Sequence, residues 1–260
     1  MSKTIRDKTM KSLPLDHVLM REIDTAKNIQ LKLLNANPLT FSSGYIVGTS
    51  IPARLIGGDY FDYVQLPNGR IRMIIGDVMG KGIPAAMQMI LTRGAFRSLA
   101  IKAQGPAETL TIMNQALIDD LRALRSFVTV FCADWDENSK TLYFANAGHT
   151  LPFYTKDGNT WSTLKGKGIM IGGLYDQTYV ESSVKLDAGG MVLFYTDGIT
   201  ESINTAGEQY GTGRLLQELN NLNSIAADEL QELILEKLQL HTEGEPQRDD
   251  LTLLILKIES

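Results

Sequence analysis

Strand-forming and helix-forming stretches fall in separate blocks along these 260 residues, and this arrangement most limits the possible folds. Helical patterns occupy residues 84–104 and 106–124 in the middle, and 212–222 and 224–240 near the end. Because strands and helices do not alternate, we predict an α+β domain with helix pairs covering antiparallel sheets. Short apolar or alternating runs bounded by turn residues predict strands at 45–51, 59–65, 71–76, 127–135, 141–146, 151–155, 179–186, 191–196 and 251–258. The glycine-containing stretch 156–177 lacks such a period, and we expect a mobile surface loop there.

An amphipathic helix is predicted before the first strand, over residues 16–35. Apolar residues recur at spacings of three and four from Leu19 to Leu33, and Asn35, Asn37 and Pro38 end the pattern. The apolar stripe is narrow. It fits either a helix that packs on the domain or one that pairs with a second copy, and spacing alone does not separate the two.

Composition excludes several classes of protein. A net charge of −5 and a pI of about 5.3 leave no broad basic face for nucleic acid or an anionic membrane. The single Cys132 excludes an internal disulfide. Apolar runs are far shorter than the roughly 18 residues of a membrane span, and the N-terminus lacks the apolar stretch of a signal peptide. We therefore expect a cytoplasmic protein.

The segment Leu66–Arg70 predicts the register of a β-hairpin. Its Leu-Pro-Asn-Gly-Arg sequence fits a three-residue loop with glycine in the left-handed position. Counting outward then pairs Phe61 with Ile75, and Asp59 with Asp77, on the apolar face. A two-residue turn would instead shift the register by one and send the two carboxylates to opposite faces.

Two carboxylates opposite each other on an apolar face repel, and burial makes their ionisation costlier. A nearby Arg54 or Lys81, a shared proton or a metal ion could offset this repulsion. A divalent ion would also explain why Asp197 and Asp249 occupy strand ends. Oxygen donors favour Mg²⁺ or Mn²⁺, whereas the scattered histidines and single cysteine disfavour a zinc site. Two such ions bridged by a water are suited to phosphoester hydrolysis.

Five motifs, in this order and spacing, resemble one known family. The chain is similar to the bacterial PPM/PP2C-type serine/threonine phosphatases of the SpoIIE and RsbU group, from about residue 22 to 258. The motifs are GGDYFDYV at 57–64, GDVMGKGIPAAM at 76–87, NAGH at 146–149, FYTDGITE at 194–201 and RDDLTLLIL at 248–256.

This resemblance implies a four-layer αββα fold, a β-sandwich flanked by helix pairs. It also implies two Mn²⁺ or Mg²⁺ ions and a metal-bridged hydroxide that attacks phosphoserine or phosphothreonine. The implied ligands, which are also the implied catalytic residues, are Asp59, Asp77, the backbone carbonyl of Val78, Asp197 and Asp249. Asp250 would help to position these ligands without binding a metal itself.

The resemblance further implies partners and a division of the chain. The family's usual substrate is a phosphorylated STAS-type anti-sigma-factor antagonist in stress signalling. Residues 1–36 would form a linker and homodimerisation helix, and 37–260 the phosphatase domain. Only residues 1–20 precede the matching helix segment, so regulation is expected from a separate activator protein, or activity is constitutive. Met79 stands where eukaryotic relatives have a proposed general-acid histidine.

Two other classes of function compete with this interpretation. One is a pseudophosphatase that binds its partner without turnover, against which the retention of all four aspartates argues. The other is a different two-metal phosphoester hydrolase, such as a nucleotide hydrolase. Three further residues are expected outside the chemistry: Asp62 at the surface or facing a helix, His149 packing a loop, and Lys81 in solvent or beside the following helix.

Overall fold

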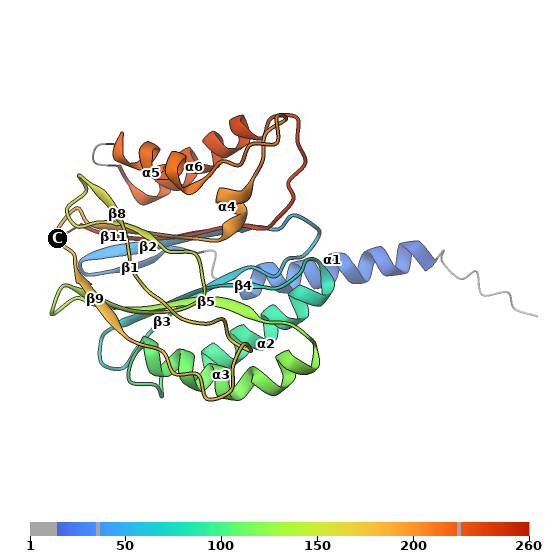
Figure 1. Ribbon diagram of the computed structural model, residues 1–260, viewed down its shortest axis with the longest axis horizontal. Coiled ribbons are helices and arrows are strands. Elements are labelled where there is room, and N and C mark those ends of the chain that lie inside the picture. The colour runs from blue at the N-terminus through green and yellow to red at the C-terminus, as the bar shows by residue number, and fades with distance from the viewer. Residues whose placement is uncertain (1–14, 35–36, 223–224, 260) are drawn as a thin grey trace, which may run out of the picture.

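The computed structural model describes residues 15–34, 37–222 and 225–259 and confirms the predicted α+β sandwich. Two antiparallel sheets lie face to face, and a helix pair covers the outer face of each (Figure 1). One sheet has the order β1-β2-β11-β10-β7-β8, and its strands are β1 (Leu39–Phe41), β2 (Gly44–Ile51), β11 (Leu251–Ile258), β10 (Met191–Tyr195), β7 (Phe153–Thr155) and β8 (Trp161–Thr163). The other has the order β3-β4-β5-β6-β9, with β3 (Tyr60–Gln65), β4 (Ile71–Val78), β5 (Val128–Asp136), β6 (Thr141–Ala147) and β9 (Ser182–Lys185).

Three apolar layers hold the four structural layers together. The middle layer lies between the sheets and contains side chains such as Phe61, Phe131 and Phe194. A second lies between the five-stranded sheet and the helices α2 (Ile83–Leu99) and α3 (Pro106–Ala123). The third packs the six-stranded sheet against α5 (Thr212–Asn220) and α6 (Ala227–His241). The central strands β10 and β11 therefore bury both faces, which explains their nearly continuous apolar runs.

The predicted hairpin register is confirmed. Phe61 pairs with Ile75, and the loop closes through hydrogen bonds between Leu66 and Arg70 and between Gly69 and Leu66. Gly69 has a φ of 85°, the left-handed conformation that the three-residue loop requires. The paired ladder stops at Tyr60 and Gly76, so Asp59 and Asp77 lie just beyond its last pair.

Some sequence predictions need correction. The stretch 156–177 is not a simple surface loop, because Trp161–Thr163 forms β8 beside β7 and the Ile171 side chain is fully buried. The strand predicted over 179–186 is shorter, and the helix predicted to reach residue 104 ends at Leu99. The short helix α4 (Asp197–Glu201) and strand β1 were not predicted. The expected role of Asn35 in ending the first helix, and the start of a helix at Ser224, lie outside the described residues.

A fully buried ion pair joins the five-stranded sheet to its helices. Arg72 on β4 and Asp134 on β5 are cross-strand partners whose side chains form two hydrogen bonds of 2.7 Å. The guanidinium also donates to the carbonyls of Ala100 and Ala103 and to the Thr109 hydroxyl. Satisfying these donors on the helix side fixes the position of the α2–α3 connection.

The predicted N-terminal helix is confirmed as α1 (Leu15–Leu33), which projects from the sandwich on the side of α2 and β4 (Figure 1). Its last turns contact the domain through Gln30, which is almost fully buried. Apolar side chains nearer its start, including Val18 and Leu19, are exposed. No helix in the described part of the chain is long and apolar enough to cross a membrane.

Candidate metal centre

The four predicted aspartates all lie at strand ends on one end of the sandwich. Asp59 directly precedes β3, and Asp77 lies near the end of the antiparallel β4. In the other sheet, Asp197 opens α4 two residues after the end of β10, and Asp249 lies two residues before the antiparallel β11. A hydrogen bond of 2.6 Å from the Thr196 hydroxyl to the Asp59 carboxylate joins the two sheets at this end.

Burial and mutual repulsion perturb the two hairpin carboxylates. Asp59 is only 4% exposed, and desolvation followed by the charge of Asp77 raises its pKa well above the ordinary value. Desolvation, then the charges of Asp197 and Asp249, raises the pKa of Asp77 to about 7, while a hydrogen bond with Asp59 opposes the shift. The electrostatic coupling therefore extends over all four predicted aspartates, because Asp77 raises the pKa of Asp59, and Asp197 and Asp249 raise that of Asp77.

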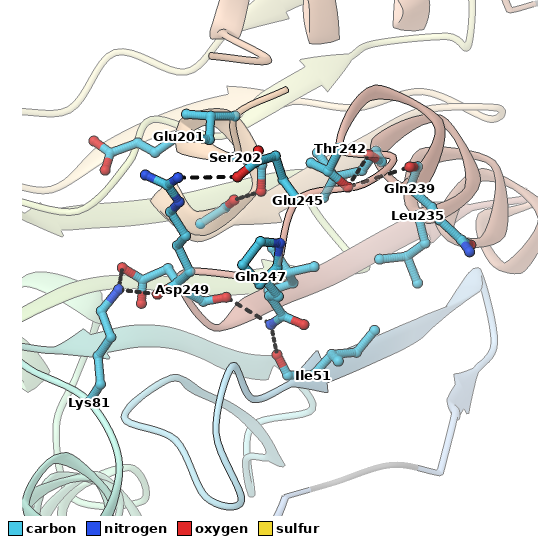
Figure 2. A pocket seen from close by; sticks show the side chains of 16 residues that line it. Ile51, Lys81, Glu201, Ser202, Leu235, Gln239, Thr242, Glu245, Gln247 and Asp249 are labelled. Atoms are coloured by element: carbon cyan, nitrogen blue, oxygen red, sulfur yellow. Dashed lines mark hydrogen bonds and ion pairs between the residues drawn. The ribbon is translucent and has the colours of Figure 1, made fainter. Parts of the chain in front are cut away.

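The second pair of carboxylates has a different environment. Desolvation, then the charges of Glu201 and Asp249, raises the pKa of Asp197. Asp249 instead forms an ion pair of 2.5 Å with Lys81, which also donates to the carbonyl of Arg248 (Figure 2). As expected, Lys81 is partly exposed and lies two residues before α2, whereas its ion pair with Asp249 was not predicted.

The carboxylates are neighbours without forming a closed cage. Within the described ranges, no three His, Cys, Asp or Glu side chains are gathered as a complete metal-binding group. Repulsion among the aspartates and the ion pair of Asp249 with Lys81 both favour such a loose arrangement. The structure thus brings the predicted residues to one place, and their role as ligands stays a prediction.

The chemistry of the donors nevertheless fits hard divalent cations. The cluster consists of carboxylate oxygens, which suit Mg²⁺ or Mn²⁺, and its raised pKa values reflect burial first and then an excess of negative charge. The predicted carbonyl ligand, Val78, lies beside Gly58: a Cβ atom placed on Gly58 would stand 3.0 Å from the Val78 carbonyl oxygen. The glycine therefore keeps space open next to this carbonyl.

Asp250 supports the loop that carries Asp59. Its carboxylate accepts hydrogen bonds from the backbone N–H groups of Ala53 and Gly58, both at 2.7 Å, and from that of Asp59 at 3.4 Å. Its own backbone oxygen would be 2.0 Å from a Cβ atom on Gly198, so only glycine fits after Asp197. One buried side chain therefore holds residues 53–59 against the start of β11, which agrees with the supporting role expected for Asp250.

The structure also shows the surroundings of Asp62 and His149, which were expected to lie outside the chemistry. Asp62 faces α2, where it pairs with Arg93 and Arg97. His149 packs a buried loop through Asn146 and through the Thr129 hydroxyl, 2.9 Å from its Nδ1 atom. Desolvation lowers the pKa of His149 to about 4, so the ring is neutral at physiological pH.

Two contacts at this site were missed by the sequence reasoning. Thr196 belongs to the FYTDGITE motif, so its position beside Asp197 was a usable signal. No sequence signal pointed to Gln30. Its side-chain amide donates to the Gly57 carbonyl at 2.7 Å and accepts from the Gly57 N–H at 3.1 Å. The first helix therefore contacts the loop that leads to Asp59.

Comparison with known proteins identifies the family. The sequence model described as "Stage II sporulation protein E (SpoIIE)" matches residues 67–259. The chain belongs to the SpoIIE family. A curated relative of this SpoIIE-family chain, "Phosphoserine phosphatase RsbU" of Bacillus subtilis (strain 168), is 30% identical over 244 residues, which cover 91% of this chain and 70% of RsbU.

Solved structures agree on the fold. The "SiaA-PP2C domain of Pseudomonas aeruginosa" has a TM-score of 0.81 at 23% identity, covering 94% of this chain and 98% of that one. RsbX, solved in complex with magnesium, has a TM-score of 0.64 at 14% identity and covers 86% of this chain and 99% of its own. These structures show a PP2C-type fold. Together with the family match and the relatives named phosphoserine phosphatases, this makes the chain a serine/threonine protein phosphatase of the PP2C type.

Proposed function

We propose that this chain hydrolyses phosphoserine or phosphothreonine on a regulatory protein, a phosphorylated STAS-type anti-sigma-factor antagonist. The observation that carries the proposal is the gathering of Asp59, Asp77, Asp197 and Asp249 at one sandwich end, with electrostatic coupling among them. A binding module would gain nothing from four mutually repelling carboxylates, because their burial costs stability. Family membership and the homologue named as a phosphoserine phosphatase support the same class of reaction.

Two Mn²⁺ or Mg²⁺ ions would be held by these four carboxylates and by the backbone carbonyl of Val78. When bound, such ions lower the pKa of a shared water and offset the negative charge of a phosphate. The surrounding residues keep the ligands in place: Thr196 fixes one oxygen of Asp59, and Asp250 anchors the backbone that precedes it. Lys81 places a positive charge beside Asp249, where it can attract a phosphate dianion.

The division into a linker helix, residues 1–36, and a phosphatase domain, residues 37–260, is part of the proposal. The described part of α1 exposes apolar side chains, Ile29 at 50% and Val18 at 40%, which suits pairing with a second copy. We propose a homodimer through this helix and a separate activator protein. The bond between Gln30 and Gly57 supplies a direct route from the helix to the loop that carries Asp59.

The first experiment measures hydrolysis of p-nitrophenyl phosphate with Mn²⁺ by the wild type and Asp197→Asn. We expect wild-type turnover and a loss of at least about a hundredfold in the variant, because a ligand carboxylate is removed. A wild type without turnover would instead favour the pseudophosphatase. A phosphorylated STAS protein is then compared with free nucleotides, and faster hydrolysis of nucleotides would identify a different two-metal hydrolase.

A second experiment tests the linker. Removal of residues 1–36 should change both the oligomeric state, measured by light scattering, and the rate of phosphoprotein hydrolysis. Monomers and dimers with equal rates, or a truncated chain as fast as the full chain, would contradict the proposed role of α1.

A further inference from the structure

A cleft of about 440 Å³ opens beside the candidate metal centre and is not used by the proposed hydrolysis. It shares Lys81, Gly198 and Asp249 with that centre, and from there it runs between the end of β2 and the C-terminal part of α6 (Figure 2). A protein that presents a phosphoserine at Asp249 must lay its neighbouring residues on adjacent surface, and this cleft is adjacent surface.

Away from the metal centre, the cleft wall carries an apolar patch beside the polar Gln239 and Thr242. Ile51 at the end of β2 is 38% exposed, and Leu235 of α6 approaches from the opposite side (Figure 2). Leu251 and the buried Leu238 complete this part of the lining. The polar backbone beneath is already satisfied, since the Gln247 amide donates to the carbonyls of Ile51 at 2.9 Å and Asp249 at 2.7 Å. A group that enters between Ile51 and Leu235 therefore meets hydrocarbon, which favours an aliphatic side chain at this patch.

The rim of the cleft has an acidic group available. Arg248 is paired with Glu245 at 3.2 Å, and Lys81 is paired with Asp249. Glu201, the last residue of α4, is exposed and belongs to none of the ion pairs among the described residues. Its carboxylate would be complemented by a lysine or arginine.

We infer that this cleft binds the residues flanking the phosphorylated serine of the protein substrate: an aliphatic side chain between Ile51 and Leu235, and a basic side chain at Glu201. The inference rests on the proposed function, whose substrate it specifies. It makes Leu235 and Ile51 specificity-determining residues, which contact the substrate away from the scissile phosphate.

The test uses the full chain with Mn²⁺ and synthetic phosphoserine peptides. Leucine and lysine are placed at each of the three positions on either side of phosphoserine in an alanine background. We expect at least one Leu/Lys arrangement to exceed the all-alanine peptide by about tenfold in kcat/KM, mostly through KM, since that factor corresponds to partial burial of one leucine side chain. Glu201→Lys should shift the preference from lysine to glutamate at the same peptide position.

Variants of the wall provide the control. Leu235→Glu should lower the ratio of peptide to p-nitrophenyl phosphate kcat/KM by about tenfold, because it places a charge where the leucine binds. Leu240→Glu is the matched variant, since Leu240 lies on the same helix, is 61% exposed and does not line the cleft. It should leave the ratio unchanged. Ile51→Glu repeats the test from the facing wall, with melting temperatures to verify folding.

The outcomes separate the two proposals. Equal kcat/KM for all phosphopeptides, or equal effects of Leu235→Glu and Leu240→Glu on the ratio, would overturn the cleft assignment and leave the phosphatase proposal standing. Absence of hydrolysis of both p-nitrophenyl phosphate and every phosphopeptide would instead refute the proposed function.

Discussion

Asp250 offers the sharpest test of how the candidate site is built. Its buried carboxylate accepts N–H groups from Ala53 and Gly58 at 2.7 Å, and from Asp59 at the weaker distance of 3.4 Å. Asp250→Ala would leave all three buried or half-buried donors without this acceptor. Losing two charge-assisted hydrogen bonds costs about 3 to 6 kcal/mol in the free energy of unfolding.

An opposing effect reduces this loss. The charge of Asp250 raises the pKa of both Asp59 and Asp77, so its removal relieves some repulsion. It is a smaller cause than desolvation in each case, and we assign it about 1 kcal/mol. The expected net destabilisation is therefore about 2 to 5 kcal/mol for Asp250→Ala. Asp250→Asn keeps one acceptor oxygen and should lose about half as much.

The assay is urea unfolding without divalent ions, followed by the fluorescence of the buried Trp135 and Trp161. Asp249→Ala is the matched control, because the Asp249 carboxylate is 39% exposed. It forms a partly exposed ion pair with Lys81 and accepts one hydrogen bond of 3.0 Å, from the Asp250 N–H. It should change stability by less than about 1 kcal/mol. Equal losses for Asp249→Ala and Asp250→Ala, or an unchanged Asp250→Ala, would refute the proposed support of the loop.

Three other predictions concern single side chains. Lys81→Met should tighten Mn²⁺ binding in calorimetry about tenfold, since it frees Asp249; unchanged affinity would contradict the competition. Between about pH 6.5 and 4, His149 binds a proton in the unfolded chain but not in the folded one. The free energy of unfolding therefore decreases as the pH is lowered, by about 2 kcal/mol at pH 5. In His149→Gln, the free energy of urea unfolding should depend less on pH. A pH dependence parallel to that of the wild type would contradict the assigned role of His149. Arg72→Met should cost about 3 to 5 kcal/mol by leaving Asp134 buried and unpaired, whereas near-neutral unfolding data would show that the pair contributes little.

Local turn chemistry made much of this site predictable. The Asn-Gly pair in Leu66–Arg70 allowed the register to be counted, and with it the approach of Asp59 and Asp77 on the apolar face. Strand periodicity likewise predicted β10 and β11, and so the strand-end positions of Asp197 and Asp249. The motifs then suggested which distant ends would meet.

Contacts between segments far apart in sequence were not predictable in the same way. Lys81 reaches Asp249 across the interface of the two sheets, and Gln30 reaches Gly57 from a helix whose apolar stripe was its only sequence signal. β8 was missed because it is three residues long and amphipathic patterning needs a longer window. The direction of each side chain, and hence which carboxylate is paired and which is exposed, follows from tertiary packing.

The position of β11 affects when this protein can become an enzyme. The last strand of the chain lies between β2 and β10, inside the sheet, and Asp249 and Asp250 immediately precede it. During synthesis, the first strands must wait for residues 251–258 to leave the ribosome before the six-stranded sheet can close. Pairings of such long sequence separation form slowly. A nascent chain that has not yet reached residue 258 therefore has no assembled carboxylate cluster and cannot yet release phosphate.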